Sequence, residues 1–249
     1  MKRAALKCLR LGICIAALST GLTRAVDVVL DAPATGRVFQ GLGAVSAGAS
    51  SRLLIDYPEP QRSQILHFLF KNNYGAALQH LKVEIGGETN SSDGTEPTHQ
   101  RTATDTNYNR GYEWWLMEQA MARNPNIQLD SLAWGAPGWI GGGNYYSTNM
   151  INYICNFLNG AKKFHNLNIN LTGVHNESAY QTSWIKSLRS ALNANGLATV
   201  KIVAADEWSD GWTIVTNIIA DVALSNAIYA WARIIPVRWI TTVLPPPRP

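Results

Sequence analysis

Residues 169–205 read INLTGVHNESAYQTSWIKSLRSALNANGLATVKIVAA, and they contain one complete strand–helix–strand pattern. Its ends, at 169–174 and 200–205, are short apolar runs typical of strands, while 182–195 repeats apolar residues at helical spacing. A strand, a helix and a second strand in this order form a right-handed crossover between parallel strands. The stretch therefore predicts a parallel sheet that is covered by helices.

The same alternation extends along the chain on both sides. Further strands are predicted at 39–45, 81–85 and 127–134, and further helices at 59–70, 112–123, 149–165 and 213–226. Five strand–helix units result, whereas a closed (β/α)₈ barrel needs eight and takes about 250 residues. We therefore expect an α/β fold, an incomplete (β/α)₈ TIM barrel, and the 46% of hydrophobic residues suffices for its core.

The first 25 residues have the pattern of a signal peptide. Four basic residues within 1–10 precede an apolar run at 11–22, and Ala25 offers a small residue for cleavage. The run is shorter than the ~20 residues that cross a bilayer, which argues against a membrane anchor. After residue 25 the chain carries 16 basic and 17 acidic residues, so no basic nucleic-acid surface is implied. We expect an exported chain, periplasmic or extracellular, or lysosomal in a eukaryote.

Cysteine, histidine and glycine usage points to neither a metal nor a cofactor. Cys155 is the one cysteine after residue 25, and its apolar helical surroundings predict a buried, inert thiol. The histidines lack the spacing of metal ligands. Gly41-Leu-Gly-Ala-Val-Ser46 has a serine where the third glycine of a dinucleotide fingerprint belongs.

The fourth predicted strand ends in Asn176-Glu177. The carboxyl ends of parallel barrel strands form the active-site mouth, so we predict Glu177 as a general acid that is partly shielded from water. Asn176 is suited to bind the 2-hydroxyl of a sugar. The alternatives are a carboxylate that favours a helix start and a glycosylation sequon at 176–178. Glu84 and Glu207, at two other predicted strand ends, compete for the catalytic role.

Aromatic and polar residues gather at the other strand ends. Trp134 and Trp139 flank a rigid turn after the third strand, and aromatic faces stack on the apolar faces of sugar rings. Core packing is favoured for Trp139 and is an equal alternative for Trp134. Thr95, within Asp93-Gly-Thr-Glu-Pro97, is a candidate hydrogen-bond partner for a sugar hydroxyl, whereas Asp93 and Glu96 are equally well explained as solvated turn residues.

A series of longer strings follows one order along residues 28–229. They are Gly41-Leu-Gly-Ala-Val-Ser, Ser51-Arg-Leu-Leu, Tyr57-Pro-Glu-Pro, Arg62-Ser-Gln-Ile-Leu, Leu81-Lys-Val-Glu-Ile-Gly-Gly, Asp93-Gly-Thr-Glu-Pro, Arg110-Gly-Tyr-Glu-Trp-Trp-Leu-Met and Arg123-Asn-Pro-Asn-Ile. In these strings and their order the chain resembles the galactocerebrosidase (galactosylceramidase) family of retaining β-galactosidases.

This resemblance implies a TIM-barrel catalytic domain, here at 26–229, that hydrolyses galactosylceramide-like glycolipids with retention. It implies Glu177 as the acid/base, in preference to Glu84 and Glu207. It also implies a substrate pocket that includes the positions of Gly43, Thr95, Trp134 and Asn176.

The chain departs from the family pattern before its catalytic pair and after Tyr229. His175 stands where the family usually has tryptophan, and an imidazole raises or lowers the pKa of a neighbouring acid according to its own charge. The family's nucleophile, a glutamate on the seventh strand, follows a Gly-Ala-His-Tyr-Pro segment on the sixth, and nothing after Tyr229 matches either.

Reading one base earlier, from the last base of the Ala230 codon, permitted codons restore Gly-Ala-His-Tyr-Pro. We therefore expect 230–249 to be a frame-shifted tail outside the family. A retaining glycosidase needs two carboxyls about 5 Å apart, so we expect little or no turnover from this chain.

Partners and alternatives follow from the same residues. The expected substrate is a glycolipid or other β-galactoside, with a lipid-presenting protein as a candidate partner and no nucleic acid or integral membrane segment. One alternative is another TIM-barrel β-glycosidase of β-glucosidase, galactanase or xylanase type, because substrate choice lies in loops. The others are a non-catalytic carbohydrate-binding fragment and a chain that never folds stably, because an open barrel exposes strand edges.

Overall fold

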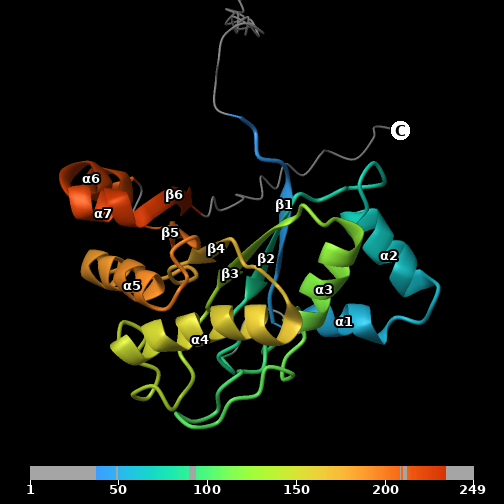
Figure 1. Ribbon diagram of the computed structural model, residues 1–249, viewed down its shortest axis with the longest axis horizontal. Helices are drawn as coiled ribbons and strands as arrows, with labels where there is room; N and C mark the ends of the chain where they lie inside the picture. The colour runs from blue at the N-terminus through green and yellow to red at the C-terminus, as the bar shows by residue number, and fades with distance from the viewer. Residues whose placement is uncertain (1–37, 49, 90–93, 208, 210–211, 234–249) are drawn as a thin grey trace, which may run out of the picture. The chain divides into compact units, whose positions relative to one another are not determined.

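The computed structural model describes residues 38–48, 50–89, 94–207, 209 and 212–233 (Figure 1). All of its helices and strands lie within the unit that begins at Gln40. The predicted signal peptide, Asp93 and residues 234–249 of the predicted tail lie outside the described residues.

Parallel strands form a single sheet in the order β1-β2-β3-β4-β5-β6. They are β1 (Gly43–Ser46), β2 (His80–Glu84), β3 (Gln128–Leu132), β4 (Leu171–Gly173), β5 (Lys201–Glu207) and β6 (Ile228–Arg233). Each pairs in parallel with the next strand along the chain. Within the described residues β1 and β6 do not pair with each other, so the predicted incomplete barrel is confirmed.

Helices occupy the connections between the strands. They are α1 (Ser50–Asp56), α2 (Gln61–Phe70), α3 (Glu113–Arg123), α4 (Thr148–His165), α5 (Thr182–Ala194), α6 (Thr213–Ala220) and α7 (Val222–Ala227). Helix α3 packs on β2 and between α2 and α4, and α5 packs between α4 and α7. Figure 1 shows this succession from α3 through α4 to α5 along the sheet. Successive helices lie side by side, as repeated right-handed crossovers require.

Two helical regions differ from the sequence-based expectations. Helix α1 was not predicted, because its seven residues bury only Ser51 and carry no apolar periodicity. The single helix predicted at 213–226 is wrong, because Asp221 leaves the helical conformation and divides it into α6 and α7. The Asp221 carboxylate accepts a hydrogen bond from the Leu224 N–H at 2.9 Å and so caps the second helix.

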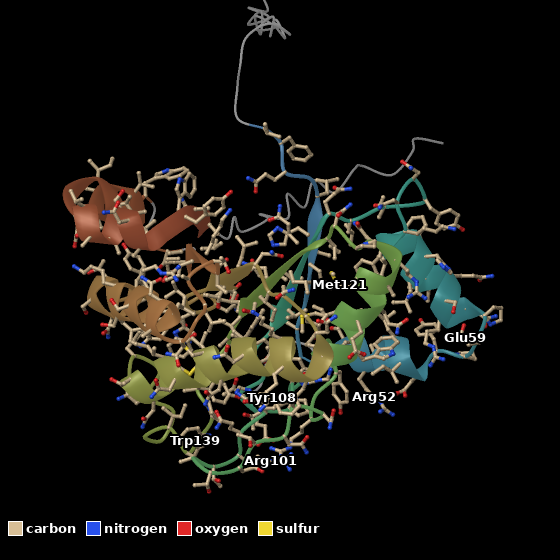
Figure 2. All side chains as sticks on the ribbon, in the orientation of Figure 1. Arg52, Glu59, Arg101, Tyr108, Met121 and Trp139 are labelled. Atoms are coloured by element: carbon tan, nitrogen blue, oxygen red, sulfur yellow. The ribbon has the colours of Figure 1, made fainter. Side chains whose placement is uncertain are left out.

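The hydrophobic core lies between the sheet and its helices, and α4 contributes most to it. Ser147 begins this helix by accepting a hydrogen bond from the Met150 N–H at 3.2 Å. Cys155, on the same helix, is 1% exposed, and burial raises the pKa of its thiol to about 11, so the predicted buried thiol is confirmed. The prediction that Trp139, labelled in Figure 2, packs on the core is also confirmed, since its side chain is partly buried against the core residues. Its indole N–H donates to the Gln100 carbonyl at 2.8 Å.

The outermost strands are more exposed than the inner ones. Three of the four residues of β1 are exposed, whereas every residue of β4 is buried. The Gln40 amide donates to the Tyr229 hydroxyl at 2.9 Å and links the start of β1 to β6 across 189 sequence positions. The Lys201 ammonium lies 4.0 Å from the centroid of the Tyr229 ring. None of the helices described here is long and apolar enough to cross a membrane.

Candidate active site

The carboxyl ends of the parallel strands lie at one edge of the sheet, which we call the rim. Asn176 and Glu177 follow β4 there and are held by neighbouring strands. The Asn176 N–H donates to the Ala133 carbonyl just after β3, and the Glu177 N–H donates to the Asp206 carbonyl in β5, both at 3.1 Å. The structure thus places the backbone of the predicted catalytic pair between the ends of β3 and β5.

The Glu177 side chain is exposed, and its backbone is left-handed, with φ of +48°. The expected shielding from water is therefore wrong for the residues that the structure describes. A left-handed conformation costs a non-glycine residue about 1 kcal/mol or more and persists only when its surroundings hold it. The exposed carboxyl is accessible to a substrate.

His175 ties the loop after β4 to the loop after β3. Its ring stacks on Tyr145 with centroids 3.6 Å apart, and Nδ1 lies 3.2 Å from the Tyr146 hydroxyl. Nε2 lies 3.3 Å from the Trp134 carbonyl, an acceptor that requires the proton on this nitrogen. Burial lowers the pKa of His175 to about 4. The imidazole is therefore neutral above that pH and places no positive charge beside Glu177.

Trp134 and Thr95 lie on adjacent loops at the rim, and both are half-buried. A Cβ at Gly87, just after β2, would come within 2.5 Å of the Gly135 carbonyl oxygen. A Cβ at Gly86 would come within 2.3 Å of the Pro97 carbonyl oxygen. Glycine at both positions lets the loops that carry Thr95 and Trp134 close in on the end of β2.

Gly43 is not brought together with these residues. It is the first residue of β1 and pairs with His80, the first residue of β2, so it lies toward the amino end of the sheet. A Cβ there would lie 2.7 Å from the His80 carbonyl oxygen. Close strand packing therefore accounts for this glycine.

The two rival carboxyls occupy different environments. Glu84 is 1% exposed, accepts a hydrogen bond from the Gly48 N–H, and has its pKa raised to about 7 by burial. Glu207 is also buried and accepts hydrogen bonds from the Ser209 N–H at 2.8 Å and the Ser209 hydroxyl at 2.9 Å. It lines a cavity of about 590 Å³ with residues of the loop before α5. Of the three carboxyls, only Glu177 is exposed.

Two buried groups of ionisable side chains were not predicted from the sequence. Glu84, Glu96 and Glu113 each leave one carboxyl oxygen without a hydrogen-bond partner among the described residues. Burial raises the pKa of Glu96 to about 8 and that of Glu113 well above its ordinary value. In the second group, the Lys82 ammonium lies 3.0 Å from Asp206 and 3.6 Å from Asp130. The sequence did contain a signal for this second group. Lysine and aspartate alternate with apolar residues inside predicted barrel strands.

The described strands and helices superpose on solved structures that are each 20% identical or less. SrfJ from Salmonella typhimurium superposes with a TM-score of 0.68 at 19% identity, over 79% of this chain and 51% of that one. The endo-β1,6-glucanase BT3312 gives 0.65 at 20% identity, over 84% and 56%. The catalytic domain of GH30 xylanase C from Talaromyces cellulolyticus gives 0.63 at 18%, over 79% and 53%. The chain shares the fold of these structures, which include a glucanase and a xylanase domain.

Sequence comparison narrows this class to one family. The family profile of Glycosyl hydrolase family 59 matches residues 39–234, and the chain belongs to that family. Galactocerebrosidase of Danio rerio is 45% identical over 221 residues, which are 87% of this chain and 33% of the relative. Galactocerebrosidase of Homo sapiens is 52% identical over 184 residues, 72% of this chain and 27% of the relative. The chain spans between about a quarter and a third of the length of the curated relatives that it matches.

Proposed function

We propose that this chain carries the acid/base half of a retaining β-galactosidase active site that acts on galactosylceramide-like glycolipids. The observation that carries the proposal is the exposed Glu177 at the carboxyl end of β4 in a chain of Glycosyl hydrolase family 59. Relatives named galactocerebrosidase support the galactosyl group and the ceramide-type aglycone.

In the proposed reaction, the Glu177 carboxylic acid gives its proton to the glycosidic oxygen as the bond to the anomeric carbon breaks. A second glutamate attacks that carbon and forms a galactosyl–enzyme ester. Glu177, now a carboxylate, takes a proton from water, which cleaves the ester and releases galactose. We propose that the second glutamate lies outside these 249 residues, on a strand after β6.

The remaining residues of the proposed site bind the sugar. Asn176 is half-buried beside Glu177, and its amide is proposed to donate to the 2-hydroxyl. Trp134 is proposed to stack on the apolar face of galactose, and Thr95 to hydrogen-bond one of its hydroxyls. We do not include Gly43, because the structure places it toward the other end of the sheet.

Binding of a galactose-configured iminosugar tests this proposal on the purified chain. Its ring nitrogen is cationic and pairs with a carboxylate, so we expect Glu177→Gln to weaken binding at least about tenfold. The matched control is Glu118→Gln, an exposed glutamate on α3 that pairs with His165 and should leave affinity unchanged. Equal affinity of Glu177→Gln and the unaltered chain would overturn the acid/base assignment.

Two further measurements separate the alternatives. Preference for a glucose-configured over a galactose-configured ligand would favour another type of β-glycosidase. Sugar binding that survives Glu177→Gln but is lost in Trp134→Ala would favour a non-catalytic carbohydrate-binding role. Steady release of galactose from an aryl β-galactoside by the 249-residue chain would contradict a nucleophile outside it.

We propose that a lipid-presenting protein delivers the glycolipid to the site.

Two further proposals concern the ends of the chain. We propose that residues 1–25 direct export and that the reading frame changes near Ala230. Strand β6 pairs with β5 through Arg233, and the family match ends at residue 234. Resequencing the Ala230 codon tests the frame change, and an unambiguous in-frame gene ending at Pro249 would refute it.

A further inference from the structure

Asp206 and Glu177 form an unusual backbone pair at the rim. The Glu177 N–H donates to the Asp206 carbonyl at 3.1 Å, and both residues are left-handed, with φ of +57° at Asp206 and +48° at Glu177. Neither is a glycine, so each conformation is unfavourable by itself. Two such residues joined by one hydrogen bond need other contacts to hold them.

The contacts that hold Asp206 come from inside the sheet. Its Oδ1 accepts a hydrogen bond from the Lys82 ammonium at 3.0 Å, and the two side chains are 7% and 15% exposed. The same ammonium lies 3.6 Å from Asp130, whose side chain is 2% exposed. Asp130 is held in turn by the Ser131 N–H at 2.7 Å. An ion pair with this little exposure to water is much less screened than a surface pair.

Gly173 leaves the room that this arrangement needs. A Cβ at Gly173, at the end of β4, would lie 3.1 Å from Asp206 Oδ2 and 2.4 Å from Leu132 Cδ1. A side chain there would push Asp206 away from Lys82 or β4 away from β3. Strands β2 to β5 therefore all contribute to the conformation of Asp206.

We propose that Asp206 is a positioning residue for Glu177, held by Lys82. Lys82 fixes the Asp206 side chain and with it the left-handed backbone that presents the Asp206 carbonyl. That carbonyl anchors the Glu177 amide and so directs the Glu177 carboxyl toward the substrate. The role of this hydrogen bond in catalysis rests on the proposed function. Whether Lys82 and Asp206 hold the Glu177 amide can be tested without a substrate.

A mutant cycle with the galactose-configured iminosugar tests the function of the anchor. Asp206→Asn keeps the size of the side chain and removes its charge, so we expect affinity to fall about tenfold when Glu177 is present. In a Glu177→Gln background we expect the same substitution to change affinity less than about twofold, because the group that it positions is gone. An equal loss in both backgrounds, or no loss in either, would overturn the proposal.

Amide hydrogen exchange of Glu177 is the second readout and needs no ligand. We expect this amide to be protected in the unaltered chain and to exchange about tenfold faster in Lys82→Met, because its acceptor is no longer held. An unchanged exchange rate of the Glu177 amide in Lys82→Met would overturn the positioning role. This result does not depend on whether Glu177 takes part in sugar binding. Should both variants fail to fold, an unprotected Glu177 amide in the unaltered chain would overturn it, and a protected one would support it.

The matched control is another lysine–aspartate pair. Lys186 and Asp221 lie 2.6 Å apart, between α5 and the start of α7. Lys186→Met removes a lysine–aspartate contact that is more exposed than that of Lys82 and lies away from Glu177, so both the affinity and the exchange rate of the Glu177 amide should stay unchanged. A change in either as large as that in Lys82→Met would show a general loss of stability and overturn the specific role.

Discussion

The inner strands β2 to β5 and the outer strands β1 and β6 show two ways of using the same parallel pairing. All three residues of β4 and six of the seven in β5 are buried, whereas β6 alternates between half-buried and exposed residues and β1 is mostly exposed. Each inner strand forms backbone hydrogen bonds with a neighbouring strand on both sides, and each outer strand does so on one side. The proposed catalytic pair and Trp134 follow inner strands, so their backbone is anchored without a closed barrel.

The largest expected effect on the unfolding free energy comes from truncating a buried apolar side chain of an inner strand. An exposed apolar side chain of an outer strand gives the comparison. Leu129 on β3 is fully buried and Val45 on β1 is 59% exposed. We expect Leu129→Ala to lower the free energy of unfolding by about 2–5 kcal/mol, since it leaves a cavity. Val45→Ala should cost less than about 0.5 kcal/mol. Chemical denaturation measures both, and similar losses would show that the two regions do not differ in packing.

The unfolding free energy measured over a pH series tests the buried carboxyls of Glu84, Glu96 and Glu113. Burial raises the pKa of Glu96 from 4.5 to about 8. The folded state thus holds a proton that the unfolded chain releases, so the unfolding free energy is highest in acid and falls as pH rises through this window.

Glu96→Gln removes one such proton. Its unfolding free energy should fall less steeply with pH, by up to about 1.4 kcal/mol per pH unit, and it should be the more stable protein at pH 8. The control is Glu118→Gln, an exposed glutamate on α3. Parallel pH profiles for Glu96→Gln and the unaltered chain would refute the buried-proton account.

Two helix-capping residues test the difference between inner and outer strands through smaller effects. Ser147 caps α4, which packs on the inner core, and Ser147→Ala should cost about 1 kcal/mol of global stability in thermal or chemical unfolding.

Asp221 caps α7 next to β6. We expect Asp221→Ala to speed hydrogen exchange in α7 and β6 while exchange in β3 and β4 stays slow. Uniformly faster exchange would mean that the edge and the centre unfold as one unit.

The smallest effect is expected on α1, beside β1. Arg52 and Asp56 form an exposed pair at 2.8 Å, one helical turn apart. Arg52→Gln should change the unfolding free energy by less than about 0.5 kcal/mol, because exposed pairs are screened by water and salt. A larger loss in denaturation would indicate that α1 is held more firmly than its exposure suggests.

The sequence was sufficient for most of the fold because the inner strands are short apolar runs and α4 has a clear buried face. It could not show α1, whose residues lack periodicity, or the break at Asp221, which depends on one side chain capping its own helix. Of the site, the position of Asn176 and Glu177 at the rim followed from strand order alone. The exposure of Glu177 did not, because a position at the end of a strand does not determine how much of a side chain its neighbours cover.

The charged residues of the interior were the hardest to assign. Lys82, Asp130 and Asp206 come from three strands, and their meeting depends on register and on the space left by Gly173. Glu96 and Glu113 come together only after the loop following β2 folds back on the start of α3. Such contacts carry no sequence periodicity, so pattern reasoning does not detect them.

The hydrogen bond between Gln40 and Tyr229 makes the order of assembly observable. Bringing together two residues 189 positions apart in an unstructured chain costs about 4–5 kcal/mol of loop-closure entropy. One exposed hydrogen bond contributes only about 1 kcal/mol, so it cannot form ahead of the strands between them. A pair of fluorophores at these two positions would report the last stage of folding, when every intervening strand has already found its neighbour.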